Sequence, residues 1–261
     1  MILENIHSPY DVKQLTNAET RRLCDEVRAF MVRSVAETGG HLASNLGVVE
    51  LTIAIHRVFN TARDRLVFDV GHQCYVHKLL TGRRDSFATM RQFGGLSGFP
   101  KPYESEHDAF VAGHASAAVS VALGMARART LRREDYSVLA LVGDASLAGG
   151  LAFEGMDDAG GSGEPLIVIL NDNGMSISEN VGALSGHLSH LRTRPAYYEL
   201  KKRYRNALTG SAAGEKFYLW SHDVKTALKK SLLPGSSLFE DMGFSYLGPV
   251  NGHDVDELTD A

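Results

Sequence analysis

Apolar residues recur along the chain at two different spacings, and together they predict alternating helices and strands. Helical spacing runs through residues 17–38 and again through 48–58, and Gly39-Gly40 would end the first of these helices. Nearly continuous apolar runs, which are typical of strands buried on both faces, lie between the helical segments. These runs occupy 66–71, 136–144 and 165–173.

Further helical segments separate the apolar runs, at 116–130 and 151–160. Helices are also expected at 196–206 and 217–232, and one more strand at 244–250. Apolar strands that alternate with helices indicate an α/β fold, in which a parallel sheet is covered by helices on both faces. Ligands of such sheets bind outside the carboxyl ends of the strands. Polar residues at those ends are therefore the first candidates for a functional site.

The composition is that of an ordinary globular protein, with 44% hydrophobic and 22% charged residues among 261. A net charge of −4 gives no basic surface for nucleic acid or an anionic membrane. No apolar window approaches the roughly 18 residues of a membrane span, and the first residues lack the pattern of a secretory signal. Two cysteines, Cys24 and Cys74, are too few for a disulfide framework. A cytoplasmic protein is expected.

Two of the apolar runs end in residues that suit a magnesium ion. Gly143-Asp144 closes one run and Asn173 closes the next, with a single helix between them. Such a unit places both strand ends on one edge of the sheet. The Asp144 carboxylate and the Asn173 amide oxygen are hard ligands, and Mg²⁺ fills its remaining positions with phosphate, water or carbonyl oxygens. Gly149 and Gly150 would let a diphosphate approach the backbone closely.

Each half of this pair also has a simpler interpretation. Asp144 alone could cap the following helix, and Asn171-Asp172-Asn173 alone could form a turn. The sequence contains no P-loop motif, no dinucleotide-binding glycine motif after a predicted strand and no HExxH motif. The paired arrangement therefore favours a site for a metal and a diphosphate over a nucleotide or zinc site.

The segments around these residues resemble one enzyme family. Gly143-Asp144 followed by Asn173 is similar to the thiamine-diphosphate motif, which begins Gly-Asp-Gly and closes on asparagine. Longer segments that cover essentially the whole chain resemble 1-deoxy-D-xylulose-5-phosphate synthase in the same order. They are SNLGVVELTIAIHRVF (44–59), FDVGHQCYVHKLLTGR (68–83), GGLSGFPK (94–101), ESEHD (104–108), AGHAS (112–116), LNDNGMSISENVGALS (170–185) and GPVNGHD (248–254).

This resemblance implies a transketolase-like, diphosphate-binding domain of a thiamine-diphosphate-dependent transferase over residues 1–261. The complete enzyme would condense pyruvate with D-glyceraldehyde 3-phosphate, releasing CO₂ and forming 1-deoxy-D-xylulose 5-phosphate. That reaction is the first step of non-mevalonate isoprenoid precursor synthesis. The implied cofactors are thiamine diphosphate and Mg²⁺, and the implied assembly is a homodimer. The implied ligands of the cation are Asp144, Asn173 and the backbone carbonyl of Met175.

The resemblance also implies roles for two histidines and for several loop residues. His41 would face the reacting carbon and the substrates, and His72 would line the cofactor site as a second catalytic residue. The implied contacts to the cofactor come from His72, Gly113, His114, Ala115, Ala145, Ser146 and Asn173. Apart from the resemblance, His41 or His77 taken singly could equally be a hydrogen-bonded turn residue.

Two departures from the family pattern change the expectation. Ala145 stands where the family usually has glycine, and its methyl group is tolerated if the backbone φ is negative. Family members are more than twice as long, with a pyrimidine-binding and a C-terminal domain that would be absent here. The sequence thus predicts a C-terminally incomplete diphosphate-binding domain. The glutamate that activates the aminopyrimidine ring would lie in a missing domain, so the isolated chain is expected to be inactive.

Three alternatives stay open on the sequence. The chain could be a transketolase-like subunit that acts with a second chain. It could be a cofactor-binding or dimerisation remnant without catalysis. It could also be a Mg²⁺-dependent phosphatase or phospho-receiver, which would need an aspartate nucleophile beside other carboxylates at strand ends, and Asp69 is the only candidate other than Asp144.

Overall fold

The computed structural model describes residues 1–173, residue 183 and residues 238–261. The chain divides into two compact units, of which the first comprises Met1–Glu179 with Val250–Ala261 and the second Asn180–Pro249. The sheet and the predicted site residues up to Asn173 belong to the first unit. The helices predicted at 196–206 and 217–232 lie outside the described residues.

Three parallel strands form the sheet, in the order β1 (Arg65–Phe68), β2 (Val138–Gly143) and β3 (Ile167–Asn171). Phe68 pairs with Leu141, and Gly143 pairs with Asn171, so the three carboxyl ends lie along one edge. Each strand was predicted from its apolar run, and each is shorter than the run. The first ends at Phe68 because Val70 and Gly71 have φ of 58° and 87°, outside the extended region.

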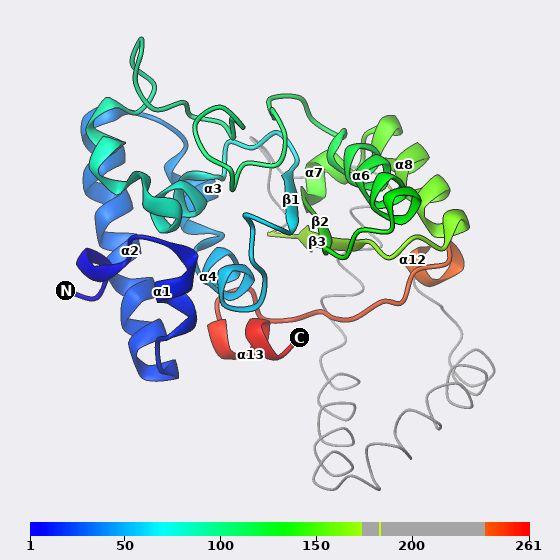
Figure 1. The fold of residues 1–261 in the computed structure, drawn as a ribbon, viewed down its shortest axis with the longest axis horizontal. Helices are drawn as coiled ribbons and strands as arrows, with labels where there is room; N and C mark the ends of the chain where they lie inside the picture. The colour runs from blue at the N-terminus through cyan, green and yellow to red at the C-terminus, as the bar shows by residue number, and fades with distance from the viewer. Residues whose placement is uncertain (174–182, 184–237) are drawn as a thin grey trace, which may run out of the picture. The chain divides into compact units, whose positions relative to one another are not determined.

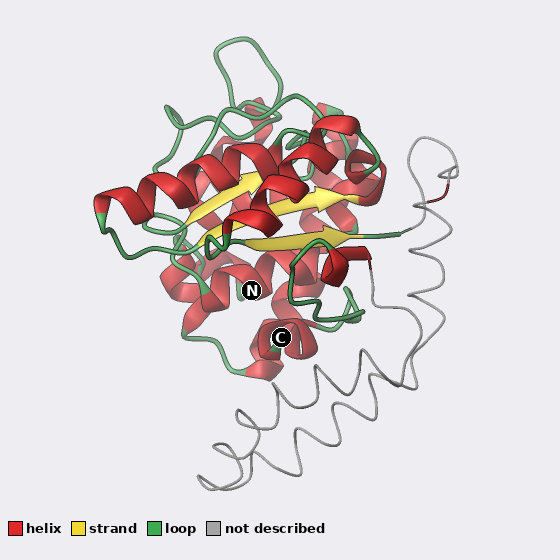
Figure 2. Cartoon of the chain, turned by 90° about the vertical axis from the view of Figure 1, so that its right-hand side faces the viewer, coloured by secondary structure: helices red, strands yellow, loops and turns green. Residues whose placement is uncertain are grey.

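Helices cover both faces of this sheet, as the sequence predicts. Leu66 and Phe68 belong to the apolar core that the strands share with α2 (Asn17–Thr38) and α4 (Val49–Val58). Val67, between them, points to the opposite face by the alternation of a strand. On that face α6 (Ala118–Arg132) packs against β1 and β2, and α8 (Gly150–Ser162) packs against α6. Figures 1 and 2 show the sheet between these two groups of helices.

Helix α2 begins and ends where local chemistry requires. The Thr16 hydroxyl accepts the Glu19 N–H at 3.3 Å, and the Glu19 carboxylate accepts the Thr16 N–H at 2.9 Å. This reciprocal pair satisfies backbone donors at the helix start. Gly39, with φ of 72°, ends the helix in a conformation that glycine adopts without strain. The predicted limits of 17–38 are therefore confirmed.

Shorter elements connect these helices and strands. They are η1 (Leu3–Asn5), α1 (Pro9–Lys13), α3 (Leu42–Leu46), α5 (Tyr75–Lys78), the π-helical turn η2 (Leu79–Arg83), η3 (Arg84–Thr89), α7 (Asp144–Leu147), α12 (Leu238–Asp241) and α13 (Val255–Asp260). Helix α13 packs against α4, and an Arg21–Asp256 ion pair joins it to α2. None of the described helices is long and apolar enough to span a membrane.

The strand predicted at 244–250 does not form. Side chains from Phe244 to Leu247 alternate between half-buried and exposed, which accounts for the strand-like pattern in the sequence. None of the residues 244–250 adopts strand structure. The Phe244 N–H instead donates to the Phe239 carbonyl at 2.9 Å, and Pro249 has no N–H to donate. An alternating pattern of burial is therefore not sufficient to make this segment a strand.

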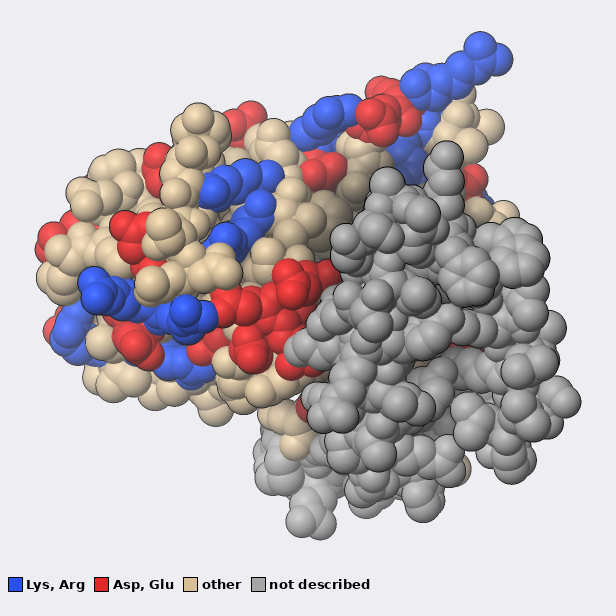
Figure 3. Space-filling view, turned by 90° about the horizontal axis from the view of Figure 1, so that it is seen from below, with Lys and Arg blue, Asp and Glu red and all other residues tan. Residues whose placement is uncertain are grey.

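Charged side chains of both signs share the face drawn in Figure 3. Lysine and arginine side chains alternate there with groups of aspartate and glutamate over the described residues. This mixture agrees with the small net charge of −4.

Candidate functional site

The segments that follow β2 and β3 leave the sheet side by side. Gly143 and Asn171 are register partners. Asp144 follows Gly143 directly, and Asn173 follows Asn171 after one residue, Asp172. Neighbouring strands lie about 4.8 Å apart, so the two predicted ligands leave adjacent positions on one edge. Asp144 is buried, begins α7, and accepts the Ala145 N–H at 2.9 Å through its own carboxylate. Asn173 is exposed.

A cation at this edge would depend mainly on oxygen ligands of mixed kinds. Among the described residues, no group of three or more His, Cys, Asp or Glu side chains could hold a metal. One carboxylate, one amide oxygen and phosphate oxygens form the mixed donor set that suits Mg²⁺. Met175, the third predicted ligand, lies outside the described residues.

A buried carboxylate joins the end of β1 to the loop that precedes α6. Asp69 accepts the Ser116 N–H at 2.8 Å and the Ala118 N–H at 3.0 Å, and so caps the start of α6. The Val70 N–H donates to the His114 carbonyl at 3.2 Å. Gly113, His114 and Ala115 are exposed and are held beside the strand end.

The backbone of these loops is held in uncommon conformations. Val70 and Ser116 have φ of 58° and 70°, and a β-branched residue at positive φ is a true outlier. Such strain persists where surrounding contacts overdetermine the backbone, and it concentrates at functional sites. Gly71 is also closely packed, because a Cβ there would lie 2.7 Å from both Ala112 and Pro100.

The loop before α6 also contacts the loop after β2. The Ser116 hydroxyl donates to the Ser146 carbonyl at 2.8 Å. At Gly149 a Cβ would lie 2.0 Å from the Ser116 hydroxyl oxygen, so glycine permits this approach. Ala145 lies within helix α7 and is exposed. Its helical backbone has negative φ, so the condition that the sequence set for tolerating its methyl group is met.

The two predicted catalytic residues, His41 and His72, lie next to each other beside these loops. His41 precedes α3 and is exposed, whereas His72 follows β1 and is half-buried. Their ring centroids lie 5.2 Å apart at an interplanar angle of 68°. The His41 Nδ1 lies 3.4 Å from the Tyr75 hydroxyl oxygen. The fold therefore brings together two histidines that are 31 positions apart in the sequence.

The environment of His72 favours a neutral imidazole. Burial, and then the charge of nearby His41, lower the pKa of His72 below its usual value, while Asp69 partly opposes the shift. The buried His72 Nδ1 has no hydrogen-bond partner among the described residues. At neutral pH the His72 ring is therefore neutral, with one buried nitrogen that is not used by a hydrogen bond in the described part of the chain.

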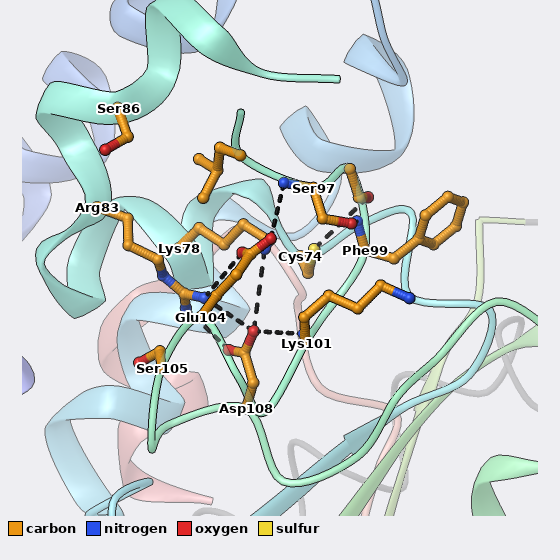
Figure 4. A network of polar contacts seen from close by, with 12 residues as sticks. Cys74, Lys78, Arg83, Ser86, Ser97, Phe99, Lys101, Glu104, Ser105 and Asp108 are labelled. Carbon is orange, nitrogen blue, oxygen red and sulfur yellow. Dashed lines mark hydrogen bonds and ion pairs between the residues drawn. The ribbon is translucent and has the colours of Figure 1, made fainter. Parts of the chain in front are cut away.

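Side chains from the segments 68–83 and 104–108 form a buried polar network. The Asp108 carboxylate accepts two hydrogen bonds from Arg83, both 2.8 Å long, and the Lys101 N–H at 2.7 Å. Glu104 pairs with Lys78 and accepts the Ser97 N–H at 2.8 Å. Figure 4 shows Lys78 and Arg83 pointing toward the two carboxylates. This network fixes the loop that contains Phe99, whose ring centroid is 6.4 Å from that of His41.

A second pair of histidines extends the network into the core. The His77 Nε2 lies 3.0 Å from an Asp108 oxygen, and its Nδ1 lies 2.9 Å from the His56 Nε2. Burial lowers the pKa of His77 to about 4, although Asp108 opposes that shift. Burial alone would raise the pKa of Asp108, but hydrogen bonds from His77 and Arg83 hold it well below the usual range. His77 is therefore a hydrogen-bonded core residue.

Asp69 cannot serve as the nucleophile of a phospho-receiver. Its side chain is 2% exposed, and each carboxylate oxygen accepts a backbone N–H. The geometry assigns it to holding two loops together. Sequence reasoning had named Asp69 only as a strand-end carboxylate of a possible phospho-receiver, and it missed the contribution of Ser116. A buried polar residue at a strand end or helix start gives little sequence signal of the backbone groups it will bind.

Comparisons with known proteins agree with this geometry. The family model for 1-deoxy-D-xylulose-5-phosphate synthase matches residues 3–261. The 1-deoxy-D-xylulose-5-phosphate synthase of Caldanaerobacter subterraneus subsp. tengcongensis is 52% identical over 98% of this chain and 41% of its own length. That of Pelotomaculum thermopropionicum is 51% identical over 99% of this chain and 40% of its own.

A solved structure supports the fold. A transketolase mutant from Pichia stipitis superposes with a TM-score of 0.51 at 22% identity, covering 60% of this chain and 27% of that one. The chain spans about two fifths of the length of the curated relatives that it matches. It belongs to the 1-deoxy-D-xylulose-5-phosphate synthase family and corresponds to the N-terminal part of its members.

Proposed function

We propose that this chain is the diphosphate-binding part of an enzyme that condenses pyruvate with D-glyceraldehyde 3-phosphate. The products would be CO₂ and 1-deoxy-D-xylulose 5-phosphate, a precursor for isoprenoids. One observation carries the proposal: the loops after β1 and β2 are both bonded to the loop before α6, at the edge where β3 also ends, and the loop after β1 contains His72 beside His41. Family membership favours this reaction over that of a transketolase-like subunit.

The residues at this edge fit thiamine diphosphate with Mg²⁺. Asp144 and Asn173 would hold the cation, together with Met175 by its carbonyl. Gly113 fits the close approach of a diphosphate, because its φ is 154° and a Cβ there would contact nothing within 4 Å. The proposed contacts to the cofactor come from His72, Gly113, His114, Ala115, Ala145, Ser146 and Asn173. When bound, thiamine diphosphate supplies carbanion chemistry that side chains lack.

The chain's own residues would position groups and handle protons. The low pKa of His72 keeps its ring neutral near pH 7, so its Nδ1 can accept a proton or a hydrogen bond. His41 is exposed beside it and would contact the substrates. Asp69 and Ser116 would keep the surrounding loops rigid, so that the reacting groups meet in a fixed geometry.

The isolated chain is expected to make no product. It spans about two fifths of its relatives, and the ring-activating glutamate would belong to the remainder. We also propose a cytoplasmic homodimer for the complete protein. If the chain were instead a non-catalytic remnant, the chimaera described below would show no turnover.

A chimaera tests the proposed function. This chain would replace the matching segment of the Caldanaerobacter subterraneus relative, and product formation from both substrates would be followed with thiamine diphosphate and Mg²⁺. We expect turnover by the chimaera, none after Asp144→Ala, and none by the isolated 261-residue chain. A folded chimaera without turnover would contradict the proposal. Turnover by the isolated chain would show that an activating carboxylate lies within it.

A further inference from the structure

One buried amide connects the two segments that contain His41 and His72. The Asn45 Nδ2 donates to the His41 carbonyl at 2.7 Å and to the His72 carbonyl at 2.9 Å. The Asn45 Oδ1 accepts the Tyr75 N–H at 2.8 Å. Asn45 is 0% exposed, so water does not compete for these bonds. Its side chain therefore spans from the start of α3 to both sides of the turn after β1.

Few side chains could make the same set of bonds. A neutral amide supplies two N–H donors and an acceptor in one plane, which matches two carbonyls and one backbone N–H. An ionised aspartate would turn an acceptor toward two carbonyl oxygens, and serine has a single donor. A further polar contact between the segments is longer: the Tyr75 hydroxyl oxygen lies 3.4 Å from the His41 Nδ1. The amide thus fixes the spacing of the two backbones most directly.

We propose that Asn45 is a positioning residue, which sets the separation and the edge-to-face orientation of the His41 and His72 rings. The catalytic importance of this inference rests on the proposed function, in which the His41 and His72 rings contact the substrates and the cofactor. Asn45 itself would touch neither substrate nor cofactor. Its effect would reach the chemistry through the two backbone carbonyls that it holds.

The interaction between the two histidines provides a readout that a purely structural role would not change. His41 contributes to lowering the pKa of His72. In the wild-type chain, His41→Ala should therefore raise the pKa of His72, as followed by NMR titration of its ring. In an Asn45→Ala background the rings would no longer be held together, so His41→Ala should leave the pKa of His72 unchanged. A nuclear Overhauser effect between the two rings should also disappear in Asn45→Ala.

The same shift on His41→Ala in both backgrounds would overturn the proposal. Asn60→Ala is the matched control, since the Asn60 side chain accepts an N–H in a distant, exposed turn. Thermal unfolding of each variant separates lost stability from lost coupling. If Asn45→Ala does not fold, Asn45→Ser replaces it, because a serine hydroxyl can still bond the His41 carbonyl within the turn. The titration needs no cofactor, so failure of the proposed function would leave this result unaffected.

Discussion

Two pairs of histidines lie near the end of β1, and they differ in almost every physical respect. His41 and His72 meet edge to face at 5.2 Å, and one ring is exposed. His56 and His77 stack at 5.0 Å with an interplanar angle of 18°, and both are 0% exposed. In the open pair, the His41 ring is exposed and a ligand could reach it. In the buried pair, Asp108 and a ring–ring hydrogen bond use three of the four ring nitrogens.

The difference shows that environment, rather than residue type or spacing, decides what a histidine does. His72 and His77 are five positions apart in one family segment, yet the first faces the candidate site and the second faces the core. A buried polar network stabilises a fold only when its members are satisfied. The open pair instead has an exposed ring, that of His41, which could contact a ligand. The predictions below separate these two roles.

The largest effect is expected at the centre of the buried network. Asp108→Ala would remove the buried carboxylate that Arg83 and His77 share, which should lower the free energy of unfolding by about 3–5 kcal/mol. Asp158→Ala is the matched control, because Asp158 also binds an arginine through two hydrogen bonds but is exposed. We expect nearly unchanged stability there. Urea unfolding measures both, and equal losses would show that burial is unimportant.

Acid should weaken the buried pair. The folded-state pKa of His77 is about 4, below the value of about 6.5 in the unfolded chain. The unfolded chain therefore binds more protons, and stability should fall by about 3 kcal/mol as pH drops from 6.5 to 4. The low pKa of His56 acts in the same direction. Urea unfolding across this window should show the loss, and His77→Gln should flatten it. If His77→Gln lost as much stability as the wild type over this pH range, His77 would not be the group responsible.

Removing one ring from each pair should have unequal consequences. His56→Ala would leave the His77 Nδ1 without its partner in the core, at a cost of about 1–3 kcal/mol. His41→Ala removes an exposed ring and should scarcely change the thermal midpoint. In the chimaera, however, His41→Ala should reduce turnover strongly. A large loss of stability in His41→Ala would indicate that the open pair is structural as well.

Sequence reasoning predicted the sheet and failed where tertiary contacts decide. The runs that became β1, β2 and β3 are nearly continuously apolar, and that signal is local. At 244–250 apolar residues also favoured a strand, but a strand depends on a partner as well as on local sequence, and the prediction was wrong. Likewise, Asp144 and Asn173 could be placed together from chain order, whereas the buried position of His77 and the bonds of Asn45 depend on distant segments.

The smallest effect is expected at Ala145. Its methyl group is exposed on a helical backbone, so Ala145→Gly should leave cofactor binding unchanged or slightly tighter. Glycine is a poorer helix former, and stability should fall by at most about 1 kcal/mol. Calorimetry and urea unfolding check both expectations. A clear loss of affinity would show that the loop has adapted to the alanine.

Binding of thiamine diphosphate with Mg²⁺, measured by calorimetry on the purified chain, tests the central claim most directly. Binding should be weak, since the relatives are more than twice as long, and it should depend on Mg²⁺. Asp144→Ala should abolish it by removing the carboxylate ligand, while the exposed control Asp158→Ala should retain it. Unchanged affinity in Asp144→Ala would contradict the assignment of the cation and diphosphate to the ends of β2 and β3.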